Sequence, residues 1–153
     1  KNIKYKIKIY ENLLDGSEHF VLLKGQIKKN AVPRVRVISS NVIKNYLINQ
    51  KLPNSFNKTL NYFKKFNNCV LVFINDTNLK SVSETLNDYK DKLLKNKTKD
   101  NLIRNYGIGA QIIKDLKIKK MILITSSPKK VIGLDGYNIK IIKQEILKWI
   151  KNA

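Results

Sequence analysis

Residues 104–137 read RNYGIGAQIIKDLKIKKMILITSSPKKVIGLDGY, and they combine a helical pattern with a short apolar run. Gly107 and Gly109 predict a turn at the start. After this turn, apolar residues recur at near-helical spacing over residues 112–118. The continuous apolar run at 121–124 is typical of a strand buried on both faces. The order of helix, strand and turn predicts half of a parallel α/β unit.

The turn after this strand is a candidate anion site. Residues 125–127, TSS, place hydroxyls ahead of Pro128, which suits the first position of a helix. The free amides at such a helix start, with Lys129 and Lys130 beside them, are sufficient to hold a phosphate or a sulfate. The alternative stays equally open: Ser127 caps the helix and the two lysines are solvated.

The rest of the chain continues the alternation of strands and helices. Apolar alternation, together with a turn at Asp15-Gly16, predicts an N-terminal hairpin followed by further strands, at residues 5–9, 20–23, 34–38, 69–74 and 139–142. Apolar residues at helical spacing predict helices at 55–66, 79–94 and 146–150. We therefore expect one α/β domain over residues 1–153, a mixed β-sheet flanked by helices.

The composition limits the classes of function. The formal net charge is +20, which is compatible with a nucleic-acid partner. The charge is nearly all lysine, however, and lysine, asparagine and isoleucine together are typical of an A/T-rich genome. Since the lysines are spread along the chain without a block of five or six, a solvated surface is favoured and nucleic acid is an unlikely partner. The sequence has no run of eighteen apolar residues, so no membrane-spanning helix is expected. Its single cysteine, Cys69, cannot form an intrachain disulfide, which fits the reducing cytoplasm.

The arginines and the single histidine are the notable polar residues. In a chain so rich in lysine, Arg34, Arg36 and Arg104 are candidates for a planar, bidentate contact with an anion. A structural salt bridge is the alternative for each of them. His19 lies at a strand edge, where a bridging polar role is favoured over that of a titrating catalyst.

The segment RNYGIGAQIIKDL, followed by LITSSPKKVIGLDGY, resembles the C-terminal half of GTP cyclohydrolase II. That family has R-D-Y-G-x-G-A-Q-I-L-x-D-L and L-T-N-N-P-x-K at these places. Upstream, Glu18-His19 and Val35-Arg36-Val37 keep the family's order. The resemblance implies the family's fold. It places Arg36 and Arg104 on arginine positions of the pattern, and Thr125 and Lys130 on positions that contact nucleotide.

The sequence departs from the family where the chemistry resides. Family members hold a catalytic zinc with three cysteines that follow the strand corresponding to residues 34–38. Here residues 38–58 contain no Cys, His, Asp or Glu, although a catalytic zinc normally needs three such ligands. Cys69 is expected to be a core residue. The aspartate that assists the family's arginine is replaced by Leu102. We therefore expect no metal, no cofactor and no catalytic residue.

The sequence thus predicts a catalytically degenerate GTP cyclohydrolase II-like domain associated with riboflavin biosynthesis. The family commonly lies behind a 3,4-dihydroxy-2-butanone 4-phosphate synthase domain, and the abrupt start at Lys1 suggests a fragment or a C-terminal domain of a longer chain. A homodimer and a structural, dimerising or regulatory role are expected. The first alternative is a module that binds GTP or phosphate through Arg36, Arg104, Thr125 and Lys130. The second is a basic nucleic-acid-binding domain.

Overall fold

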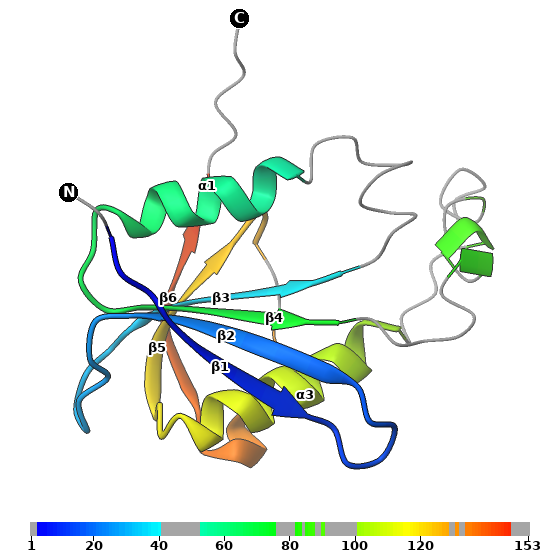
Figure 1. Cartoon of the computed structure of the whole chain (residues 1–153), viewed down its shortest axis with the longest axis horizontal. Helices are drawn as coiled ribbons and strands as arrows, with labels where there is room; N and C mark the ends of the chain where they lie inside the picture. The colour runs from blue at the N-terminus through cyan, green and yellow to red at the C-terminus, as the bar shows by residue number, and fades with distance from the viewer. Residues whose placement is uncertain are drawn as a thin grey trace, which may run out of the picture.

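The computed structural model describes residues 3–40, 53–75, 82–83, 85–87, 90, 101–128, 131 and 134–147. At 53–54 and 101–106 it describes the backbone only. The strands are β1 (Lys6–Glu11), β2 (Glu18–Lys24), β3 (Arg34–Ser39), β4 (Cys69–Ile74), β5 (Lys120–Thr125) and β6 (Lys140–Ile146). The helices are α1 (Pro53–Phe63), α3 (Asn101–Asp115) and a single 3₁₀ turn, η2 (Asp135–Tyr137) (Figure 1).

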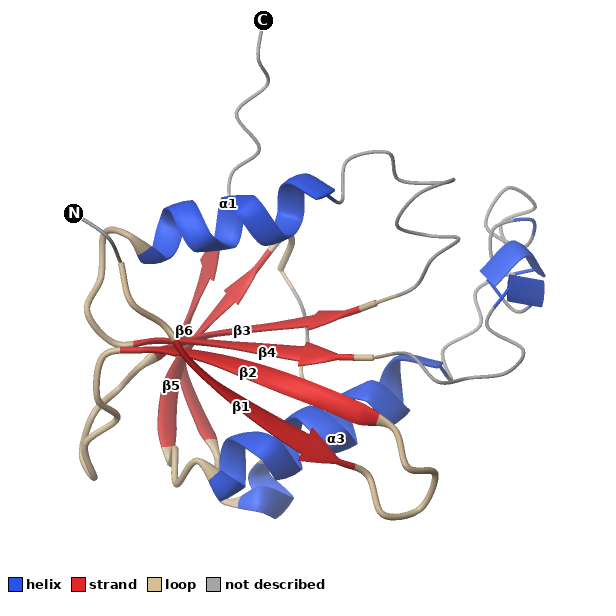
Figure 2. Ribbon diagram, in the orientation of Figure 1, coloured by secondary structure: helices blue, strands red, loops and turns tan. Residues whose placement is uncertain are grey.

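The six strands form one mixed sheet, as expected from the sequence. Their order in the sheet is β1-β2-β4-β3-β5-β6 (Figure 2). β1 and β2 form an antiparallel hairpin, and β2 is antiparallel to β4. β4, β3, β5 and β6 are parallel to one another. We call the end of the sheet where these four strands begin the amino end, and the end where they finish the carboxyl end. The start of β1 and the finish of β2 also lie at the amino end, since Lys24 pairs with Cys69.

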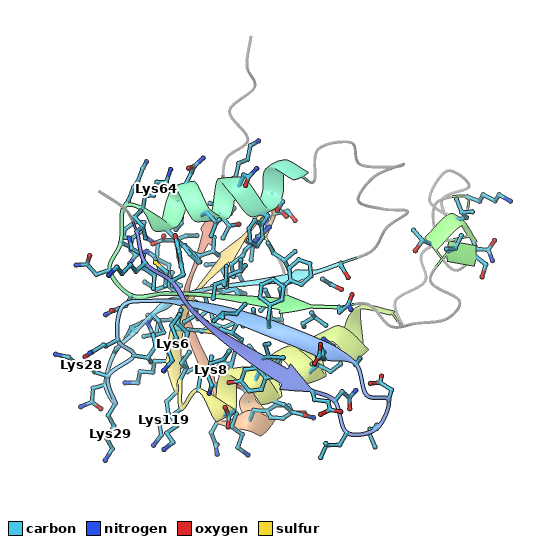
Figure 3. The ribbon with its side chains drawn as sticks, in the orientation of Figure 1. Lys6, Lys8, Lys28, Lys29, Lys64 and Lys119 are labelled. Carbon is cyan, nitrogen blue, oxygen red and sulfur yellow. The ribbon has the colours of Figure 1, made fainter. Side chains whose placement is uncertain are left out.

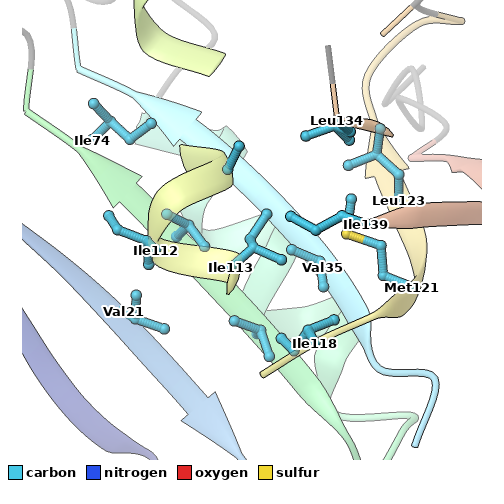
Figure 4. Close-up of a cluster of buried hydrophobic side chains, with 13 residues drawn as sticks. Val21, Val35, Ile74, Ile112, Ile113, Ile118, Met121, Leu123, Leu134 and Ile139 are labelled. Atoms are coloured by element: carbon cyan, nitrogen blue, oxygen red, sulfur yellow. The ribbon is translucent and has the colours of Figure 1, made fainter. Parts of the chain in front are cut away.

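The two helices cover opposite faces of the sheet (Figure 1). Because side chains alternate along a strand, each central strand supplies residues to both faces. On the α1 face, Phe63 packs with buried residues of three strands, namely Ile38, Leu71 and Ile124. On the α3 face, Ala110, Ile112 and Ile113 pack with Val21, Val35, Val70, Val72, Met121 and Leu123 (Figure 4). The central strands of the sheet are therefore buried on both faces.

Lys24 fixes the C-terminal end of α1 to the end of β2. Its ammonium donates hydrogen bonds to the carbonyls of Phe63, Lys64 and Phe66, at 2.7, 3.2 and 2.6 Å. These carbonyls belong to the last turn and its exit, where a helix lacks internal partners and where a cation is favoured. The next residue, Gly25, has φ +77, and a Cβ atom there would collide with the backbone of Asn67.

The turn predicted at Gly107 and Gly109 is wrong, because both glycines lie inside α3. Gly109 has a packing role instead. A Cβ atom there would lie 3.3 Å from Ile74 Cδ1 and 3.5 Å from Val37 Cγ1, so its absence lets α3 approach the sheet closely. The helix ends at Asp115, and the positive φ of Lys117, 59°, turns the chain toward β5.

Two further expectations at the C-terminal end are also wrong. Pro128 is not helical, and the helix described between β5 and β6 is the short turn η2. The short turn η2 connects to β6 without a longer helix. It brings Leu134 and Ile139 into the core together, and the Ile139 N–H donates a hydrogen bond to the Leu134 carbonyl. Ile146, expected in a helix, ends β6, where it pairs with Thr125. The rest of the expected helix at 146–150 lies mainly outside the described residues.

Of the helix expected at 79–94, the described residues 82–83, 85–87 and 90 are helical. Across the described part of the chain, no helix is long and apolar enough to span a membrane.

Candidate functional site

The sheet opens between β3 and β5 at its carboxyl end. The β3–β5 pairing finishes at Arg36 and Ile124, whereas β3 stays paired with β4 as far as Ser39. β3 is followed by α1 on one face, and β5 is followed by η2, which contacts α3 on the other. Such a reversal between neighbouring parallel strands is the usual place for a ligand in an open α/β sheet. We call this place the β3–β5 crevice.

Thr125 lies in this crevice on the α3 face. Its side chain is 3% exposed and borders a cavity of about 40 Å³, which is also lined by Val37, Gly109, Ile113 and Leu134. Within the described part of the chain, its Oγ1 has no hydrogen-bond partner. A buried hydroxyl without a partner costs free energy, and the cavity is large enough for a small polar group. The geometry thus leaves this hydroxyl available to a ligand.

Arg36 lies on the opposite face, beneath the first turn of α1. Its side chain is 8% exposed. Nη1 donates to the carbonyl of Ile124 at 3.1 Å, and Nη2 donates to Ser55 Oγ at 3.4 Å. Since a buried cation needs such polar partners, the guanidinium ties the start of α1 to β5 next to the crevice.

The described structure therefore does not bring the four predicted site residues together. Arg36 and Thr125 both adjoin the point where β3 and β5 separate, but their side chains lie on opposite faces of the sheet. Arg104 belongs to the first part of α3, and its side chain is outside the described residues. Lys130 is also outside them. One anion pocket formed by all four stays a prediction.

Cys69 lies far from the crevice, at the amino end of β4. Its side chain is fully buried, and Sγ points at the carbonyls of Phe63 and Phe66, at 4.0 and 3.9 Å. Burial raises the pKa of its thiol to about 11, a value that disfavours the thiolate. Cys69 is thus the core residue that the sequence predicts. No cluster of three or more His, Cys, Asp and Glu side chains occurs among the described residues.

His19 bridges two strands at the carboxyl end. It is 2% exposed, the Asn75 N–H donates to its Nδ1 at 3.0 Å, and Nε2 lies 3.3 Å from Ser17 Oγ. Burial lowers the pKa of the imidazole, although Asp15 opposes the effect. A neutral ring with the proton on Nε2 satisfies both contacts, so the bridging role expected from the sequence agrees with this geometry.

Sequence reasoning missed a polar cluster on the α1 face that joins three elements. Arg34 Nε lies 3.4 Å from Glu145 Oε2, and the guanidinium stacks 3.6 Å from the Phe66 ring centroid. The Tyr62 hydroxyl donates to the same carboxylate. Burial and this carboxylate raise the Tyr62 pKa to about 12, while the Tyr62 hydrogen bond lowers the Glu145 pKa.

For Arg34, the salt bridge left open by the sequence is therefore correct. The sequence did contain one clue to this cluster: Arg34 and Arg36 are two residues apart on a strand, so their side chains lie on the same face of β3. What it lacked was the strand order that brings β6 near β3 on that face.

Comparison with known proteins identifies relatives along nearly the whole chain. A sequence model described as GTP cyclohydrolase II matches residues 2–146. The "Riboflavin biosynthesis protein RibBA" of Chlorobium phaeovibrioides is 29% identical over 98% of this chain and 39% of its own length. The protein of that name from Aquifex aeolicus is 28% identical over 94% of this chain and 38% of its own. The one from Bacillus subtilis is 54% identical over 26% of this chain and 10% of its own. The chain thus spans about two-fifths of the length of the first two relatives.

Proposed function

Because the chain belongs to the GTP cyclohydrolase II family, we propose that it keeps the family's fold for a non-catalytic role in riboflavin biosynthesis. In this proposal the domain does not open the imidazole ring of GTP. It acts as a structural, dimerising or regulatory unit beside a 3,4-dihydroxy-2-butanone 4-phosphate synthase domain.

The observation that carries this proposal is the run of residues that follows β3. Between Ile38 and Lys58 the sequence has no Cys, His, Asp or Glu. The next cysteine, Cys69, is buried at the other end of the sheet with its thiol disfavoured as a ligand. Ring opening by this family needs a metal-activated water, and neutral amide and hydroxyl side chains are poor ligands for zinc.

The partner domain is proposed from the relatives. The two RibBA proteins that match almost all of this chain share only 39% and 38% of their length with it. The family commonly lies behind a 3,4-dihydroxy-2-butanone 4-phosphate synthase domain, and we propose that synthase as the partner here. Association of the purified chain with such a domain, measured by ultracentrifugation, tests this part separately.

Zinc content and turnover test the loss of chemistry directly. The purified chain would be loaded with zinc, desalted and analysed by mass spectrometry, and formate release from GTP would be followed in parallel. We expect less than one-tenth of an equivalent of zinc and no formate above background, while a family member with three zinc cysteines gives both. One equivalent of retained zinc with formate release would refute the proposal.

A second candidate function is binding of a nucleotide or phosphate without turnover. The observation that favours it is the buried Thr125 hydroxyl, which has no partner within the described part of the chain and borders the β3–β5 crevice. A hydrogen bond from this hydroxyl to an ionised phosphate would contribute about 1.5–3 kcal/mol. That contribution corresponds to roughly tenfold to a hundredfold in affinity.

Calorimetry with GTP and with inorganic phosphate tests this second function. We expect Thr125→Val and Lys130→Ala each to weaken binding by about tenfold or more. Lys90→Ala is the matched control, because Lys90 is an exposed lysine that does not line the cavity beside Thr125. Absence of binding at millimolar ligand, or an equal loss in the control, would exclude this function.

A further inference from the structure

Lysines that are scattered along the sequence converge at the amino end of the sheet. They lie at the starts of strands, in the loops that lead to those starts, or in the last turn of α3, because each connection returns the chain to this end. Figure 3 shows Lys6, Lys28, Lys29, Lys64 and Lys119 around it. The amino-end lysines are Lys4, Lys6, Lys28, Lys29, Lys64, Lys65, Lys114, Lys117, Lys119, Lys120 and Lys140, and all of them are exposed.

Their charge is poorly compensated within the described part of the chain. The ion pairs described there are Lys8–Asp115, Arg34–Glu145 and Lys143–Glu145, and none includes an amino-end lysine. The acid among these lysines is Asp115, between Lys114 and Lys117, and its carboxylate already pairs with Lys8. At the opposite end, by contrast, the β1–β2 hairpin carries the acidic residues Glu11, Asp15 and Glu18. A genome-wide preference for lysine codons would not by itself gather eleven exposed lysines at one end of the sheet.

The sheet also holds two of these positive charges close together. Lys120 and Lys140 are directly opposite in the β5–β6 ladder, and Lys119 accepts the Lys140 backbone N–H through its carbonyl. Like charges directly opposite each other destabilise a sheet, and self-repulsion lowers the stability of the compact state. A polyanion on this end would relieve that repulsion.

We propose that the amino end of the sheet binds the phosphate backbone of a nucleic-acid duplex without sequence preference. Lysine is a point-charge partner for phosphate, whereas arginine forks make the commonest specific base contacts. Arg34, which begins β3 at this end, is already engaged by Glu145 and by the Phe66 ring. The nearby aromatic rings of Tyr5 and Phe66 are partly buried in the α1-face core and offer no open stacking platform, a feature that favours a duplex over a single strand.

The dimensions of the sheet suit such a partner. Five spacings of about 4.8 Å separate the outer strands, so the end spans roughly 24 Å. A duplex presents one phosphate per 3.4 Å of axis on each strand, or roughly seven over that span. If about four of them are contacted at once, affinity should fall roughly a hundredfold between 50 and 200 mM salt.

Fluorescence anisotropy with labelled 20-base-pair DNA and RNA duplexes tests the proposal, and it uses no GTP. We expect both double variants, Lys28→Glu/Lys29→Glu and Lys119→Glu/Lys120→Glu, to weaken binding at least tenfold at 50 mM salt. Each should also reduce the slope of log affinity against log salt by about 2. The matched control is Lys58→Glu/Lys90→Glu, which changes the net charge equally on residues away from the amino end and should change affinity less than threefold.

Thermal denaturation of each variant shows whether a loss of binding comes from a loss of folded protein. Lys120→Glu places opposite charges across the β5–β6 ladder, so the Lys119→Glu/Lys120→Glu variant should be at least as stable as the parent in low salt. The relative affinity of the DNA and RNA arms identifies which duplex is preferred. Three results would overturn the proposal: no binding at 50 mM salt, an equal loss in the control variant, or competition by poly-glutamate as effective as that by a duplex of equal charge.

Discussion

Replacing Thr125 by valine should stabilise the protein, although it removes a polar group at the candidate site. The side chain is 3% exposed, and its Oγ1 lacks a partner among the described residues. Leaving a buried hydroxyl unpaired costs about 1–3 kcal/mol. Valine has nearly the same shape and suits a strand, so Thr125→Val should raise the free energy of unfolding by about 1 kcal/mol or more. At this chain length, each kcal/mol shifts Tm by roughly 2–4 °C.

Thr59 provides a control with the same chemical change and the opposite expected sign. It is also fully buried, but its Oγ1 donates to the Ser55 carbonyl at 2.8 Å. Thr59→Val loses that bond and leaves the helix propensity of the site nearly unchanged, so it should cost about 0.5–1.5 kcal/mol.

Urea denaturation of the ligand-free protein measures both variants against the parent. If Thr125→Val is destabilising by as much as Thr59→Val, the Thr125 hydroxyl is satisfied in solution, and the reasoning about an available group at the crevice is refuted. If Thr125→Val stabilises the protein while GTP binding weakens, the hydroxyl is kept for a ligand at the expense of stability.

Three other perturbations follow from local geometry. Gly107→Ala, where the Cβ meets open space, should stabilise α3 by about 0.5–1 kcal/mol through helix propensity, whereas Gly109→Ala should lose that gain because its Cβ presses on Ile74; equal effects in urea denaturation would contradict this. The folded-state pKa of His19 is lowered, so the unfolded chain binds the extra proton, and stability should fall as the pH drops below about 6.5; His19→Gln should flatten that part of the stability profile. The folded-state pKa of Glu145 is lowered, chiefly by the Tyr62 hydrogen bond, so its contribution is present above about pH 4.5 and is lost as the pH falls through the folded value; Glu145→Gln should be less stable at pH 7 and less sensitive to acid, and an unchanged acid profile would count against the cluster.

The sequence predicted what depends on local periodicity. The strands at 20–23, 34–38 and 69–74, and the helix at 55–66, follow from apolar spacing, and the structure confirms their types with small changes in bounds. Glycine misled the interpretation of residues 107 and 109. A glycine inside a helix and a glycine in a turn are alike in sequence, and only the nearby sheet shows that Gly109 permits a close approach.

The candidate site was less accessible to sequence reasoning because it depends on strand order. Arg34 and Arg36 share one face of β3, yet one pairs with Glu145 of β6 and the other supports the first turn of α1. Thr125 was correctly placed at the end of a buried strand. That its side chain lies on the opposite face from Arg36 follows only from the register between β3 and β5. The clustering of lysines at the amino end could not be predicted for the same reason, because strands that are neighbours in the sheet are far apart along the chain.

The attachment of α1 has a mechanical consequence. Lys24 holds the last turn of this 11-residue helix, and Arg36 holds its first turn through Ser55. The two anchors, at Phe63 and Ser55, are about 12 Å apart along the axis, and only the second adjoins the β3–β5 crevice. Between the anchors, Thr59 and Phe63 are fully buried against the sheet. Loss of the Arg36–Ser55 contact would therefore loosen the first turn of α1, while the rest of the helix stays packed.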